Sequence, residues 1–215
     1  MEQTDNKPDG HLIALAMAAH PDDIEFMMSG TLLLLKQAGA EIHICNLANG
    51  CYGSQVYGKE EAARVRALEA QEAARVAGAV WHPSLFDDVG LYYDAASLAK
   101  VSAVVREIRP DILLTLSRYD YMEDHEYASR LASSAAFNRC LPSYVTDPPQ
   151  PSSSKPVAVY HSYVESMADA AREVGRRYGG CEFAEGWRRH NHMGYCAADY
   201  APLETALAPF LKQTK

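Results

Sequence analysis

The chain has 215 residues, of which 48% are hydrophobic and 22% are charged, as in ordinary globular proteins. These values exclude wholesale disorder, and the length allows one compact domain, residues 1–215, to bury a core without disulfides. The formal charge of −8 provides no overall attraction for nucleic acid or for an anionic membrane.

Two further features concern the cellular setting. The N-terminus is polar and acidic, and no apolar run is long enough to span a bilayer, so we expect a cytoplasmic protein without a transmembrane segment. The five cysteines are scattered and form no CxxC pair, which favours buried free thiols over disulfides or a structural zinc site.

The first part of the chain alternates strand and helix patterns. The apolar run 12–19 predicts a strand buried on both faces, and residues 24–38, closed by a glycine, predict a helix. A second strand is predicted at 41–47, and the length of the crossover requires these strands to be parallel. After a glycine-containing loop, 59–77 predicts an alanine-rich helix. Parallel strands with helical crossovers indicate the α/β class.

The same alternation continues toward the C-terminus. We expect a proline- and serine-rich loop at 141–156 and no second core after it. The expected elements are a short strand within 79–86, a helix at 97–107, a strand at 111–116, a helix from Glu126, a strand at 157–164 and a helix at 168–178.

The densest group of ionisable residues, His20-Pro21-Asp22-Asp23, directly follows the first predicted strand. Ligands of open parallel sheets bind outside the carboxyl ends of the strands. A hydrolytic zinc site needs about three nitrogen or oxygen ligands, an open position for water, and a carboxylate that takes the proton of that water. His20 and one aspartate would supply two ligands, and the other aspartate would be the base. A polar turn that caps the next helix explains these residues equally well.

A second polar cluster, residues 119–125, follows the fourth predicted strand and offers His125 as the missing ligand. Taken alone, it is better explained as a solvated acidic turn that opens the next helix. The two clusters are far apart in sequence, yet both fall at carboxyl ends of predicted strands. This coincidence favours a shared metal site.

These segments together resemble a known family. The strand followed by AHPDD, the loop NGCYGS, the helix VRALEAQEAARVAG, the strand DILLTL and the later D-x-x-x-DH are similar to the PIG-L/LmbE-like N-deacetylases, from about residue 12 to residue 187. The resemblance implies a Rossmann-like, mostly parallel sheet with helices on both faces. It also implies one zinc ion (Zn2+) per subunit and removal of the acetyl group from N-acetylglucosamine-type conjugates.

Roles carry over by position. The resemblance implies that His20, Asp23 and His125 are the metal ligands and that Asp22 is the general base. Arg66 matches a position associated with substrate binding or loop ordering. A solvated helical arginine, paired with a glutamate one turn away, explains Arg66 equally well.

The sequence departs from the family at Met122, where many members carry the first histidine of HPDH. That histidine is thought to polarise the substrate carbonyl, and a thioether cannot donate a hydrogen bond. We expect His192 to supply the missing donor, with His190 as the second candidate, although a surface histidine pair explains both. The hydroxyls of Tyr121 and Tyr52 are further candidate donors.

Trp187 is a candidate for stacking on a sugar ring, although aromatic residues near loops more often pack. Three functions therefore stay open: an N-deacetylase of amino-sugar conjugates, an amidase for a larger amide, and a metal- or sugar-binding homologue with reduced or lost catalysis. The expected partner is a small N-acetylated sugar or glycoconjugate and not nucleic acid, and a homo-oligomer is compatible with the sequence.

Overall fold

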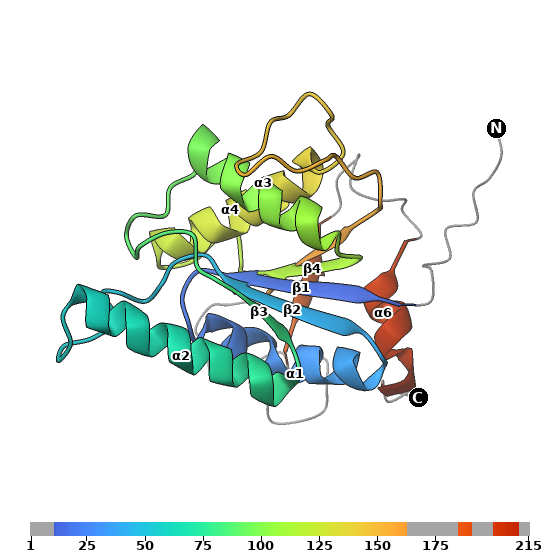
Figure 1. Ribbon diagram of the computed structural model, residues 1–215. Coiled ribbons are helices and arrows are strands. Elements are labelled where there is room, and N and C mark those ends of the chain that lie inside the picture. Colours follow the sequence, from blue (N-terminus) through green and yellow to red (C-terminus); the bar gives the residue numbers. More distant parts are fainter. Residues whose placement is uncertain (1–10, 163–184, 191–199, 211–215) are drawn as a thin grey trace.

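The structure is a computed structural model that describes residues 11–162, 185–190 and 200–210. Within these residues the centre is a six-stranded sheet with the order β3-β2-β1-β4-β5-β6 (Figure 1). The first five strands are parallel, and β6 is antiparallel to β5. The strands are β1 Ile13–Ala18, β2 Glu41–Asn46, β3 Val80–His82, β4 Ile112–Thr115, β5 Ala158–Ser162 and β6 Trp187–Arg189.

Helices cover both faces of the sheet, as expected. In Figure 1, α1 and α2 lie on one face and α3 and α4 on the other, while α6 lies beside α1. The helices are α1 Asp23–Gln37, α2 Lys59–Ala77, α3 Ala95–Ile108, α4 Glu123–Asn138 and α6 Pro202–Leu207, followed by a 3-10 turn at Ala208–Phe210.

The core lies along the central strands. Leu15 and Met17 on β1 and Leu113 on β4 are fully buried, and their register places Leu15 beside Leu113. Burying a side chain of this size contributes about 1.5 to 3 kcal/mol. A strand between two helical layers buries both of its faces, which explains why β1 is a continuous apolar run.

Most predicted elements are confirmed, and the differences are local. The α4 helix begins at Glu123, three residues before the predicted start, because acidic residues in its first turn interact favourably with the helix dipole. The predicted third strand is only three residues long, with one further bridge between Ala48 and Phe86. The antiparallel β6 was not predicted, and the predicted helix 168–178 lies outside the described residues.

None of the helices within the described ranges combines the length and apolar character that crossing a membrane requires.

Candidate functional site

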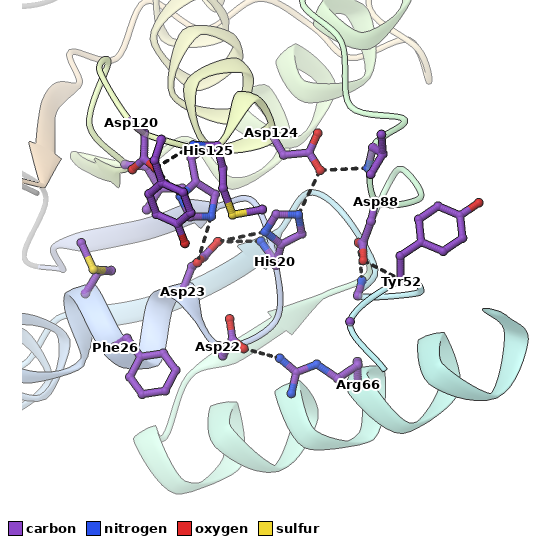
Figure 2. A pocket seen from close by; sticks show the side chains of 17 residues that line it. His20, Asp22, Asp23, Phe26, Tyr52, Arg66, Asp88, Asp120, Asp124 and His125 are labelled. Atoms are coloured by element: carbon purple, nitrogen blue, oxygen red, sulfur yellow. Dashed lines mark hydrogen bonds and ion pairs between the residues drawn. The ribbon is translucent and has the colours of Figure 1, made fainter. Parts of the chain in front are cut away.

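A cavity of about 400 Å³ opens at the carboxyl edge of the sheet (Figure 2). Its walls come from the segments after β1, β2 and β4, as predicted, and also from the turn after β3. The polar residues that follow separate strands therefore meet in one place.

Three predicted ligands converge in this cavity. His20 lies in the loop between β1 and α1, Asp23 is the first residue of α1, and His125 lies in the first turn of α4. One ligand atom from each lies within 4.8 Å of the others. Asp23 lies between the imidazoles, with Oδ1 at 3.3 Å from Nε2 of His125 and Oδ2 at 3.7 Å from Nδ1 of His20.

The outward nitrogen of each imidazole is held by a second carboxylate. His20 Nε2 lies 3.0 Å from Asp124 Oδ2, and His125 Nδ1 lies 3.1 Å from Asp120 Oδ1. Metal-binding histidines commonly have their second nitrogen held in this way, which fixes the ring and leaves the inner nitrogen as a ligand. Two imidazoles and one carboxylate, oriented so, fit a divalent metal such as zinc.

The electrostatics favour positive charge at the centre. Burial alone would raise the pKa of Asp23, but hydrogen bonds with His125 and His20 hold that pKa well below its usual range. Burial would lower the pKa of His125, yet its bonds to Asp120 and Asp23 raise it to about 10. The cavity therefore stabilises a cation beside Asp23.

Asp22 occupies the N-cap position of α1 but does not cap the helix with its side chain. Its backbone has φ 119°, in the region that L-residues rarely adopt, and such strain is found mostly where function requires it. Its carboxylate instead faces the cavity and lies 2.5 Å from the Arg66 guanidinium. Burial raises the pKa of Asp22, against the opposing charge of Arg66. The simple capping interpretation does not explain this side chain.

Arg66, on α2, reaches across to the loop that precedes α1, where Figure 2 shows its contact with Asp22. It donates to Asp22, to the carbonyl of Pro21, and to Glu69 at 2.7 Å. Arg66 thus pairs with Glu69, as the helical interpretation predicts, and it also lines the cavity, where its contact with a substrate stays a prediction. Its stem crosses Gly50, which has φ 74° and where a Cβ would lie 2.8 Å from Arg66 Cγ, so this position requires glycine.

The turn after β3 connects two walls of the cavity. The buried Asp88 accepts hydrogen bonds from the backbone N–H groups of Gly50 at 2.7 Å and Tyr52 at 2.9 Å. The next residue, Val89, has φ 58° and donates its N–H to Asp124 at 2.9 Å. Sequence reasoning missed these residues, although an acidic turn after a predicted strand is the signal that revealed the other clusters.

Three other predicted residues line the cavity: Met122, Tyr121 and Tyr52. Tyr121 is 77% exposed and packs edge-on against the His125 ring. Met122, in the place of the usual histidine, presents a side chain that cannot donate to a carbonyl.

The residues predicted in the C-terminal region have a different placement. Trp187 does not line the cavity, and its indole N–H donates to Thr31 on α1 at 2.9 Å, as a packing residue would. His190 also lies outside the lining, with Nδ1 3.2 Å from Nε2 of His161. His192 lies outside the described residues.

The fold and the cavity together define an α/β protein with a histidine and carboxylate cluster of the type that holds a catalytic metal. The sequence matches the family described as PIG-L: GlcNAc-PI de-N-acetylase over residues 15–136. This match covers more than half of the chain, and the protein belongs to that family.

Solved structures with the same fold include three with little sequence identity. The N,N'-diacetylchitobiose deacetylase from Pyrococcus horikoshii is 19% identical, with a TM-score of 0.72 over 90% of this chain and 88% of that one. The 4-carboxy-2-hydroxymuconate hydratase GalB from Pseudomonas putida is 17% identical, with a TM-score of 0.66 over 87% and 99%. A conserved protein from Thermus thermophilus is 22% identical, with a TM-score of 0.67 over 88% and 98%.

Proposed function

We propose that this protein is a zinc-dependent hydrolase that removes the acetyl group from the nitrogen of an amino-sugar conjugate. Family membership supports this class of reaction. The observation that carries the proposal is the convergence of His20, Asp23 and His125, with each imidazole also held by an outer carboxylate. A purely structural cluster has no need of this orientation.

His20, Asp23 and His125 would hold the metal. A bound zinc ion supplies Lewis acidity, which lowers the pKa of water and polarises a carbonyl. Asp120 and Asp124 act as positioning residues, because they fix the rings of His125 and His20.

Asp22 is the proposed general base. Its carboxylate faces the cavity next to Asp23, where it accepts a proton from the attacking water. A C–O bond then forms at the acetyl carbon, and the C–N bond breaks as Asp22 returns the proton to the departing nitrogen. The products are acetate and a free amine. Arg66 keeps Asp22 turned toward the cavity and away from the N-terminus of α1.

The carbonyl oxygen also needs a hydrogen-bond donor, a role that Met122 cannot fill. We propose His192 as this donor. His190 is less suited, because one of its ring nitrogens already contacts His161.

The substrate contacts that we propose are Arg66 and Tyr121, which line the cavity. Exposed aromatic rings at the mouth, Phe26 and Tyr52, offer surfaces for a sugar ring or an apolar group (Figure 2). A cavity of about 400 Å³ accommodates more than an acetyl group, which keeps a larger amide conjugate as an alternative substrate.

A second candidate reaction is the addition of water to a carbon–carbon double bond of an unsaturated carboxylate. A hydratase shares this fold, and Met122 leaves the described part of the cavity without the usual histidine donor to an amide carbonyl. Arg66, beside Asp22, would then pair with the substrate carboxylate.

The deciding experiment combines metal analysis of the purified protein with an acetate-release screen over N-acetylated sugars and their conjugates. We expect one divalent metal per chain and release of acetate that Asp22→Asn abolishes. Asp147→Asn, an exposed aspartate that does not line the cavity, is the matched control. Metal binding without acetate release, together with hydration of an unsaturated carboxylate, would instead establish the second candidate.

A further inference from the structure

A second cavity has a volume of about 270 Å³, and the segment after β4 contributes residues both to it and to the first cavity. It lies between the segment after β4, the outer face of α4 and the residues that precede α3. Its lining within the described residues consists of Tyr93, Arg118, Tyr119, Arg130 and Ser134, and we call it the arginine cavity. No carboxylate belongs to this described lining.

The two guanidinium groups bring more positive charge to this cavity than the single ion pair of Arg130 balances. Arg118 is exposed and makes no hydrogen bond or ion pair within the part of the chain that the structure describes. Arg130 gives one nitrogen to Glu126 at 3.2 Å, which leaves its other N–H groups available. Two like charges at one cavity repel each other unless an anion lies between them. The net charge of the chain is −8, so the overall composition does not account for two arginines at one cavity.

Hydroxyl groups complete the set of donors. The Tyr93 hydroxyl lies 2.9 Å from Ser134 Oγ, so one of the two protons is used between them and the other is available. Tyr119 is 81% exposed and adds a third hydroxyl. Guanidinium groups surrounded by hydroxyls match the donor pattern that carboxylate and phosphate groups require.

We propose that the arginine cavity binds an oxyanion, a carboxylate or a phosphate, carried by the substrate conjugate. Tyr119 in this cavity directly precedes Asp120, which holds His125 in the first cavity, and adjacent Cα atoms are about 3.8 Å apart. A conjugate with its amide in the first cavity would extend over Tyr119 to Arg118. The preferred substrate is therefore an anionic conjugate and not a neutral sugar, an inference that rests on the proposed function.

The first test measures binding without catalysis. We expect sodium phosphate or sodium acetate, compared with sodium chloride at equal ionic strength, to raise the melting temperature of the metal-loaded protein. The anion that raises the melting temperature more, phosphate or acetate, identifies the preferred oxyanion. Arg118→Gln combined with Arg130→Gln should abolish the effect, while Arg118→Lys should keep part of it. Arg75→Gln, an exposed arginine paired with Glu72 on α2, is the matched control and should keep all of it.

The second test compares substrates. The ratio of kcat/KM for a phosphorylated or carboxylated N-acetyl sugar to that for its neutral parent should fall about tenfold or more in Arg118→Gln, because a hydrogen bond to a charged group is lost. An unchanged ratio overturns the inference, as does anion stabilisation that persists in the double variant, since that anion would occupy the first cavity. Arginine-dependent anion binding in a protein that releases no acetate would refute the proposed function and leave the anion site standing.

Discussion

The carboxylate of Asp22, which precedes α1, lies 2.5 Å from the guanidinium of Arg66 on α2. This pairing draws Asp22 away from the backbone N–H groups that an N-cap residue usually satisfies. It holds the carboxylate at the cavity in a strained backbone conformation. The first two predictions follow from this contact.

Asp22→Asn should retain the metal but lose most of its turnover. The amide keeps the shape of the carboxylate and can still contact Arg66, but it cannot accept a proton at neutral pH. General-base catalysis contributes about a hundredfold to ten-thousandfold, and we expect a loss in that range. Metal content and acetate release, measured on one preparation, check both parts. Loss of metal from this variant would mean that the roles of Asp22 and Asp23 are exchanged, and Asp23→Asn supplies that comparison.

Arg66→Gln should lower kcat by about ten- to a hundredfold, because it removes charged hydrogen bonds to Asp22 and to the Pro21 carbonyl. Glu69→Gln removes the other partner of Arg66 and should change kcat little. Steady-state measurements of kcat for Arg66→Gln and Glu69→Gln test this prediction. Equal losses in the two would show that Arg66 acts mainly by stabilising α2.

The outer carboxylates should control metal affinity. Asp120→Asn and Asp124→Asn should each weaken metal binding about ten- to a hundredfold, since each frees the ring of one proposed ligand. Competition with a chelator of known affinity measures the change, and Asp147→Asn is the control. Unchanged metal affinity in both variants would show that these carboxylates do not orient the histidines for metal binding.

A buried histidine away from the cavity should make the fold sensitive to acid. Burial lowers the pKa of His161 to about 4, and the charges of His190, Arg118 and Arg188 act in the same direction, against a hydrogen bond with the Leu116 carbonyl. The unfolded chain binds the proton near pH 6.5, so between pH 6.5 and 4 it holds more protons than the native state. Stability is therefore complete above pH 6.5 and falls, by up to about 3 kcal/mol from this group, as the pH approaches 4.

Urea unfolding at pH 7 and pH 4.5 tests this behaviour. The loss of stability between these values should be smaller in His161→Gln than in the wild type, because glutamine does not titrate. His11→Gln, at an exposed histidine, should leave the difference unchanged. Other acid-sensitive groups are common to all three proteins and cancel in the comparison. The same loss in His161→Gln and wild type would show that His161 is not responsible.

The carbonyl donor is tested by a double-mutant cycle. His192→Ala should lower turnover by about a hundredfold or more without changing metal content. Met122→His should give little gain in the wild type, where the role is filled, and a large recovery in the His192→Ala background. A large gain in the wild type would show that the native site lacks a donor.

The strands and helices were predictable because each carries a local signal. The continuous apolar run of β1 indicates a strand that is buried on both faces. His20 lies in the loop after this strand and therefore at the carboxyl edge of the sheet. The convergence of Asp23 and His125 followed from the same edge rule. The candidate ligand atoms lie near one another because parallel strands bring their carboxyl ends to one side of the sheet.

The missed features depend on contacts between distant residues. Asp88 accepts a hydrogen bond from the backbone of Gly50, and Asp124 contacts the His20 ring. The hydrophobic periodicity of a sequence does not predict such contacts between distant residues. The three residues of β6 are too few to form a pattern of their own, and their strand exists because the edge of β5 is available for pairing. Trp187, which the sequence offers as a candidate for stacking on a sugar ring, lies on β6 and contacts Thr31 of α1 instead of the cavity.

The turn at residues 87–90 connects two walls of the cavity through hydrogen bonds. Asp88 sets the position of the loop after β2, and Val89 sets the position of Asp124 at the start of α4. An insertion or deletion in this turn would move both walls at once, whereas the long loop 141–156 makes no contribution to the cavity lining. Redesign of the pocket should therefore keep the length of this turn fixed and vary the side chains of Phe26 and Tyr52, because these exposed rings line the entrance, whereas Tyr121 packs against the His125 ring.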